Sequence, residues 1–370
     1  MNFDFSEDQK FVQKTARDYL AEHSDLSVCR AVLESDQSYD RTLWKGVAEM
    51  GWLGAAIPES YGGAGLGYLE LVLIAEEVGR ALAPIPFSSS VYVATEAILR
   101  HGSDEQKKKY LPRLASGDLV GTFAVAEGPG DLVGGTLQVE LAKGKLTGTK
   151  LPVADGDVAG LAVVLAKEGS GASLALVELG GAGVTQTPFK SFDPSRSIGK
   201  LEFAGAAAER LGAEGKGAEL LSGILDRAAA IMAFEQIGGA QRALEITRDF
   251  TMNRWAFGRP VASFQALKHR MAELYAAIEI ARSNAFYSAW ALSHDAPELG
   301  VAAAASRVAA CKAFQLAGEE MIQMHGGVGF TWEYDCHLFY RRARYTGSML
   351  GTAAEWSEKL VARLEKQYAA

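Results

Sequence analysis

The middle of the chain carries a β-type pattern between two helical regions, and this order is the strongest restriction on its fold. From about Leu119 to Phe203, stretches such as G-T-F-A-V-A and L-A-V-V-L-A alternate or are rich in β-branched residues. Glycine or aspartate turns separate these stretches, as expected for short strands. The section therefore predicts a small antiparallel β domain or barrel. Because it has no βαβ alternation, a Rossmann unit is excluded.

Both flanking regions predict helices. Ser6 opens the stretch S-E-D-Q, which has the form of a capping box, and Ser103 opens the similar stretch S-D-E-Q. From about residue 215 to the end the pattern is helical again, interrupted at Gly326 and Gly327. We therefore divide the chain into a helical region over residues 1–118, a β region over 119–210 and a second helical region over 211–370.

The composition is that of an ordinary soluble globular protein, with 48% hydrophobic and 22% charged residues among 370. Acidic residues outnumber basic ones by 45 to 37, which argues against a nucleic-acid partner because phosphate binding depends on Lys and Arg. The three cysteines, Cys29, Cys311 and Cys336, are odd in number and widely spaced, which indicates reduced thiols. The histidines show no metal-ligand spacing. An acidic start and the lack of long apolar runs predict a cytoplasmic protein without membrane insertion.

Two segments in the last third are distinctive together. They are R-W-A-F-G-R-P-V-A-S-F-Q-A-L-K-H-R-M-A-E at 254–273 and I-Q-M-H-G-G-V-G-F-T-W-E-Y at 322–334. With the helical, β, helical order they resemble the acyl-CoA dehydrogenase family, in which R-x-x-F-G-x-x-x-x-x-F-Q and Q-x-x-G-G-x-G-F recur. The resemblance covers essentially the whole chain. It implies an α+β fold with an N-terminal helical domain, a central β-barrel-like domain and a C-terminal four-helix bundle.

The resemblance also implies FAD as cofactor. The family's FAD contacts map onto Arg254, Phe257, Gln265, Gln323, Gly326 and Gly327. Their types suit the task, because an arginine can fork onto a pyrophosphate, a phenylalanine can cover an aromatic ring, and a glycine lets the backbone approach. Taken singly, Arg254 has the alternative of a solvated helix-end arginine, and the glycine pair that of a plain helix break. His325 suggests packing or a flavin-edge contact.

In the family these FAD contacts come from a neighbouring subunit, so an oligomer is expected, either of one chain or with a related subunit. The implied reaction removes a proton α to the thioester of an acyl-CoA substrate and a hydride from its β carbon. The implied electron acceptor is an electron-transfer flavoprotein.

The sequence departs from the family where the catalytic base is expected. The family's Y-E-G-T falls on M-L-G-T at 349–352, so the glutamate is Leu350, and an alternative position for the base is Ala228. In the β region, the T-E-P-x-x-G-S-D stretch appears as A-E-G-P-G-D at 126–131. The W-I-T segment that flanks the flavin is replaced by K-L-P-V-A-D-G at 150–156.

Glu235 is the remaining candidate for a base. It stands in a long apolar helical run, seven residues after Ala228, and so faces nearly the same way about 10 Å further along a helix. Burial would raise the pKa of this carboxyl group toward the range useful for a base. The alternative is a core glutamate paired with an arginine such as Arg242 or Arg282.

Three hypotheses therefore follow from the sequence. The first is an active α,β-dehydrogenase that uses Glu235 or another base. The second is a subunit of a hetero-oligomer whose partner supplies the base or half of each FAD site, as in relatives that act on bulky ring-bearing acyl-CoA substrates. The third is a non-catalytic structural partner that keeps the fold.

Overall fold

The structure is a computed structural model that describes residues 5–129 and 137–369. It contains two compact units. The first unit comprises the chain up to Ala31, Val72–Ala83 and the chain from Ala229 onward. The second unit comprises Val32–Leu71 and Pro84–Ala228. The expected division at residues 118 and 210 follows the order of helices and strands and stays a prediction.

The chain begins with helices, as expected. They are α1 (Glu7–His23), α2 (Leu26–Leu33), α3 (Arg41–Glu49), α4 (Tyr68–Arg80), the π-helical segment η3 (Ser88–Thr95), α5 (Glu96–His101) and α6 (Asp104–Ala115). Both predicted capping boxes are confirmed. The Ser6 hydroxyl accepts from the backbone N–H of Gln9 at 3.2 Å, and the Gln9 side chain accepts from the Ser6 N–H at 2.9 Å. Ser103 and Gln106 make the same reciprocal pair.

The strands of the second unit form one eight-stranded sheet. They are β1 (Gly121–Ala124), β2 (Glu140–Ala142), β3 (Lys145–Ala154), β4 (Leu161–Glu168), β5 (Gly171–Glu178), β6 (Val184–Phe189), β7 (Ile198–Ala207) and β8 (Glu209–Leu211). The order is β6-β7-β3-β2-β4-β5-β8, with β1 added beside β4. Leu161–Ala166 of β4 are all buried, because β4 pairs with β1, β2 and β5 inside the sheet.

This sheet corrects the prediction of an antiparallel domain or barrel. The pairs β1–β4 and β2–β4 are parallel, so the sheet is mixed. The path ends at β6 on one side and β8 on the other, and these two strands do not pair within the described residues, so the sheet stays open. The alternating pattern predicted strands correctly, but pairing direction depends on how connections run between strands that are distant in sequence.

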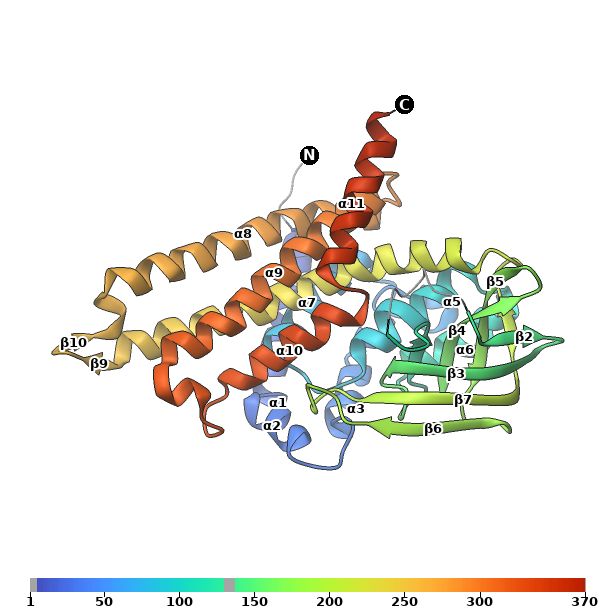
Figure 1. Ribbon diagram of the computed structural model, residues 1–370, viewed down its shortest axis with the longest axis horizontal. Helices are drawn as coiled ribbons and strands as arrows, with labels where there is room; N and C mark the ends of the chain where they lie inside the picture. Colours follow the sequence, from blue (N-terminus) through green and yellow to red (C-terminus); the bar gives the residue numbers. More distant parts are fainter. Residues whose placement is uncertain (1–4, 130–136, 370) are drawn as a thin grey trace. The chain divides into compact units, whose positions relative to one another are not determined.

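The C-terminal region is a helical bundle. Its helices are α7 (Gly217–Asn253), α8 (Gln265–Ser293), α9 (Leu299–His325), α10 (Cys336–Met349) and α11 (Ala353–Tyr368). Figure 1 shows α8 and α9 as long neighbouring helices, and α8 is joined to the end of α7 by the hairpin of β9 (Trp255–Ala256) and β10 (Arg259–Pro260). The predicted interruption at Gly326 is confirmed, since α9 ends there and a 3₁₀ segment, η5 (Gly326–Phe330), follows. Within the described ranges, no helix is both long enough and apolar enough to cross a membrane.

In the first unit, α4 and α7 cross with their backbones in direct contact. A Cβ atom added at Gly79 would lie 1.8 Å from the carbonyl oxygen of Glu235, and one added at Gly238 would lie 1.8 Å from that of Glu76. Two glycines on two helices therefore face the partner's backbone reciprocally. This crossing places Glu235 in the interior of the unit, with 1% of its surface exposed.

The crossing gives a stability prediction. Gly79→Ala forces the two helices apart, because an interior cannot absorb a methyl group at 1.8 Å from a backbone oxygen. We expect a loss of about 3 kcal/mol or more in the free energy of unfolding, measured by urea denaturation. Gly347→Ala on α10 is the matched control. A Cβ there meets nothing within 4 Å, so this variant should be neutral or slightly stabilised. Equal stabilities for the two variants would contradict the crossing.

Candidate cofactor site

The hairpin between α7 and α8 presents an aromatic side chain to solvent. Its two turn residues, Phe257 and Gly258, have φ values of +54° and +76°, which is the pattern of a type I′ turn. Glycine adopts this conformation freely, whereas a phenylalanine there costs about 1 kcal/mol. The Phe257 side chain is 94% exposed. A bulky apolar group held outward at a conformational cost favours a contact outside this chain.

The other expected FAD contacts are also on the surface of the first unit. Arg254, Phe257, Gln265, Gln323, Gly326 and Gly327 are all exposed. The Arg254 side chain makes no hydrogen bond or ion pair with the residues that the structure describes. Gly326 has φ +64°, which favours glycine, and a Cβ at Gly326 or Gly327 would meet nothing within 4 Å. The accessible backbone of the two glycines, the Arg254 guanidinium and the exposed Phe257 ring are groups that suit contact with a dinucleotide cofactor.

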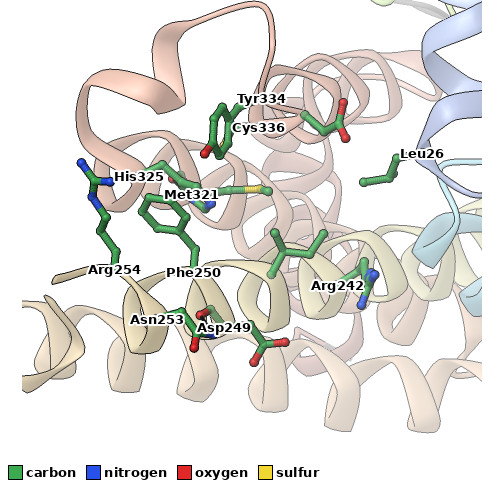
Figure 2. A pocket seen from close by; sticks show the side chains of 12 residues that line it. Leu26, Arg242, Asp249, Phe250, Asn253, Arg254, Met321, His325, Tyr334 and Cys336 are labelled. Atoms are coloured by element: carbon green, nitrogen blue, oxygen red, sulfur yellow. Dashed lines mark hydrogen bonds between the residues drawn. The ribbon is translucent and has the colours of Figure 1, made fainter. Parts of the chain in front are cut away.

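A cavity of about 500 Å³ brings two of these regions together. It is lined by Leu26, Arg242, Ile246, Asp249, Phe250, Asn253, Arg254, Met321, His325, Tyr334, Asp335 and Cys336. Figure 2 shows Arg254 at one end, beside the end of α9, and Arg242 and Leu26 at the other. The cavity thus connects Arg254 with the residue that precedes Gly326. The remaining expected contacts are not among its lining residues.

Three aromatic rings form the wall of this cavity. The His325 and Phe250 rings are stacked with centroids 4.1 Å apart, and Tyr334 meets them edge-on at 6.2 and 6.1 Å. His325 Nδ1 donates to the Met321 carbonyl at 2.6 Å, which leaves Nε2 as an acceptor. Burial lowers the pKa of His325, so the ring is neutral at pH 7. The sequence suggested packing for His325, but its partner Phe250 was missed, although an aromatic residue four positions before Arg254 was a visible signal.

The two positions at which the family resemblance predicts the base hold apolar side chains. Leu350 and Ala228 are fully buried. The turn around Leu350 is firmly held, because the Leu350 carbonyl accepts from Trp356 Nε1 at 2.9 Å and the buried Arg307 donates to the Thr346 carbonyl at 2.6 Å. Neither position can accept a proton.

Glu235 lies at the crossing of α4 and α7 in the first unit. Of the two arginines named as its possible partners, Arg282 binds Glu76 at 2.5 Å, and Arg242 lies 3.7 Å from Glu245. The interior position agrees with the sequence pattern. The role of Glu235 as base stays a prediction.

The second unit holds the segment that replaces W-I-T. Lys150 is fully buried and donates to the Val125 carbonyl at 2.9 Å and to Glu127 at 2.6 Å. Burial lowers the pKa of Lys150. Asp155, also buried, accepts from the Ser89 hydroxyl at 2.6 Å and from Arg196 at 3.1 Å. The last two positions of the 126–131 stretch lie outside the described residues.

Comparison with known proteins decides the family. The N-terminal domain of acyl-CoA dehydrogenases matches residues 6–118, and the C-terminal domain matches residues 215–363. Acyl-CoA dehydrogenase IpdE2 of Mycobacterium tuberculosis is 32% identical over 355 residues, which cover 96% of each chain. The chain belongs to the acyl-CoA dehydrogenase family. Members of this family are FAD-dependent flavoproteins, so the expectations of fold and cofactor are confirmed.

Solved acyl-CoA dehydrogenase structures share the whole fold. A chain of the Tcur3481-Tcur3483 steroid ACAD is 30% identical, with a TM-score of 0.89, and the match covers 98% of this chain and 99% of the other. A chain of the ChsE4-ChsE5 complex from Mycobacterium tuberculosis is 29% identical, with a TM-score of 0.88 and the same coverage.

The buried histidine gives a pH prediction. Because the folded pKa of His325 lies below its ordinary value of 6.5, the unfolded chain binds protons more readily. Stability from this group is present above pH 6.5 and is lost as the pH falls through the folded pKa. We expect the free energy of unfolding to fall between neutral and mildly acidic pH. His325→Phe keeps the ring against Phe250 and should remove this part of the slope.

Denaturation of both proteins at several pH values measures the effect. His337 serves as a comparison, because burial and the nearby Arg30 and Arg341 lower the pKa of this second histidine too. His337→Phe should remove a separate part of the slope. A His325→Phe slope identical to that of the wild type would show that His325 protonates freely in the folded state.

Proposed function

We propose that this chain takes part in the α,β-desaturation of an acyl-CoA thioester as one subunit of an assembly, in which a related partner chain supplies the proton-abstracting carboxylate. The observation that carries the proposal is the buried Leu350 at the position of the family's glutamate. Removal of a proton α to a thioester needs a carboxylate in a site without water. This chain keeps the turn and lacks the acid.

The surface of the first unit supports a partner chain. Trp255 and Phe257 of the hairpin are 64% and 94% exposed, and Phe330 of η5 is 84% exposed. Exposed aromatic side chains are typical of interface anchors. Two similar structures are of assemblies named for two components, the ChsE4-ChsE5 complex and the Tcur3481-Tcur3483 steroid ACAD. The latter, as a steroid ACAD, also supports a ring-bearing acyl-CoA as the substrate class.

The chain's own residues bind and orient the cofactor in this proposal. Arg254 would fork onto the pyrophosphate, Phe257 would cover an aromatic ring, and Gly327 would let the backbone approach the cofactor. Gln265 at the start of α8 and Gln323 near the end of α9 offer amide donors and acceptors. FAD, when bound, would supply a hydride acceptor for the β carbon, and an electron-transfer flavoprotein would take up the electrons.

Catalysis through Glu235 is the second candidate, favoured by its burial in the first unit. Glu235→Gln preserves size and hydrogen-bonding shape. If a partner supplies the base, the rate of flavin reduction per FAD-bound assembly stays unchanged, while about 1–3 kcal/mol of stability is lost with the weakened charged interaction. Anaerobic stopped-flow bleaching by a panel of acyl-CoA thioesters measures the rate.

The matched control for this measurement is Glu245→Gln. Glu245 lies on the same helix and is bound by Arg80, so it reports the effect of removing a charge from α7. A loss of several orders of magnitude in rate for Glu235→Gln alone would make Glu235 the base. An FAD-bound assembly that no thioester bleaches would instead favour the non-catalytic structural partner.

A second prediction concerns Arg254. Arg254→Ala should weaken FAD binding in the assembly by about 10-fold to 100-fold, the loss expected for a charged hydrogen bond. Titration of the apo assembly with FAD, followed by flavin fluorescence, measures the change. Arg248→Ala is the control, because Arg248 is an exposed arginine on the same helix that pairs with Asp249. Equal affinities for the two variants would remove Arg254 from the site.

A further inference from the structure

In the second unit, the segment that replaces W-I-T offers no side chain suited to contact a flavin ring. Residues 150–156 include no aromatic ring and no hydroxyl group. Their two polar side chains are Lys150 and Asp155, and both are buried. The Lys150 ammonium group donates hydrogen bonds to Glu127 and to the Val125 carbonyl. An isoalloxazine needs a flat partner for its face and donors for its ring nitrogens and oxygens.

Backbone N–H and C=O groups of the same segment also already have partners within the unit. The Leu151 N–H donates to the Ala126 carbonyl at 2.9 Å, and the Leu151 carbonyl accepts from Gly128 at 2.8 Å. The Asp155 N–H donates to Ser197 at 2.9 Å. Pro152 has no N–H. Val153 and Ala154 pair with β7, at Gly199 and Ile198.

A buried ion pair fixes this arrangement. Arg196 and Asp155 are each 1% exposed and lie 3.1 Å apart. Arg196 also donates to the Ser88 hydroxyl at 2.9 Å, and Asp155 accepts from Ser89 at 2.6 Å, so η3 is linked to the segment directly through Ser89 and indirectly through Arg196. Moving the segment to admit a ring would separate two charges in the interior, which is strongly unfavourable.

The first unit differs, because its expected FAD contacts are exposed. The Arg254 side chain binds no other residue within the described part of the chain. We infer that this chain does not hold a flavin ring on the described residues of its β-sheet unit, and that it contributes the outer contacts of its helical bundle to FAD held by the partner chain. The inference rests on the proposed function. It assigns one FAD to each pair of unlike chains.

The stoichiometry of the wild-type protein tests the inference directly. The assembly is purified through a tag on this chain, and released FAD is compared with the amounts of both chains. One FAD per two chains is expected, and one FAD per chain overturns the inference. This chain alone, incubated with excess FAD and desalted, should keep no flavin, and retention near one per chain would also overturn it.

Hydrogen exchange locates the cofactor on this chain. Removal of FAD from the assembly should increase exchange in peptides that cover residues 254–265 and 323–327, and leave 150–156 and 88–95 unchanged. Increased exchange at 150–156 would refute the inference. If the 254–265 peptides do not respond and 150–156 is also unchanged, the proposed function loses its cofactor contacts while the inference about the β-sheet unit stands.

Variants keep the two results separate. Asp155→Asn weakens the ion pair with Arg196, and FAD content per folded assembly should remain at the wild-type value, because no flavin contact is lost. Should this variant fail to fold, Ser89→Ala removes one hydrogen bond to Asp155 in a milder way. Loss of FAD from folded assemblies of either variant would place the flavin in this chain and overturn the inference.

Discussion

The contact between the backbones of α4 and α7 is the constraint on which the first unit depends. Gly79 and Gly238 allow the helices to meet without intervening side chains. Helix α7 also packs on α8 through Phe234 and Phe286 and on α9 through Gly239 and Phe314. The same closeness buries the carboxylates of Glu76 and Glu77, which Arg282 and Arg17 then bind. Burial nonetheless raises the pKa of Glu76. The tight crossing of α4 and α7 and the buried ion pairs of Glu76 and Glu77 therefore occur together in the interior of the first unit.

The turn between α10 and α11, where the family resemblance predicts the base, is held by a buried arginine. Arg307 is fully buried and is bound by neutral acceptors, among them the Gln236 side chain at 2.8 Å and the Thr346 carbonyl at 2.6 Å. A cation at the end of α10 also suits the negative end of the helix dipole. These bonds hold the backbone of the turn and do not require an acid at Leu350. A leucine at the predicted position of the base is therefore compatible with this turn.

The two units differ in what they offer to a cofactor. In the first unit, polar and aromatic groups stand outward with their bonding capacity unused by the described residues, as at Arg254 and Phe257. In the second unit, the buried Lys150 binds Glu127 and the buried Arg196 binds Asp155. In the proposed assembly of unlike subunits, each chain would complete one half of a site.

Much of the fold was determined by the sequence itself. The capping serines, the alternating strands and the apolar periodicity are local signals, and the paired motifs around Arg254 and Gly326 supplied the family. The open mixed sheet, the cavity wall of Phe250, His325 and Tyr334, and the ties of Asp155 to η3 were decided by the tertiary structure. Local patterns fix which residues are apolar or begin a helix. Which distant strands pair, and whether a buried charge such as Glu235 lies in a helix crossing or a site, depends on contacts between residues far apart in the chain.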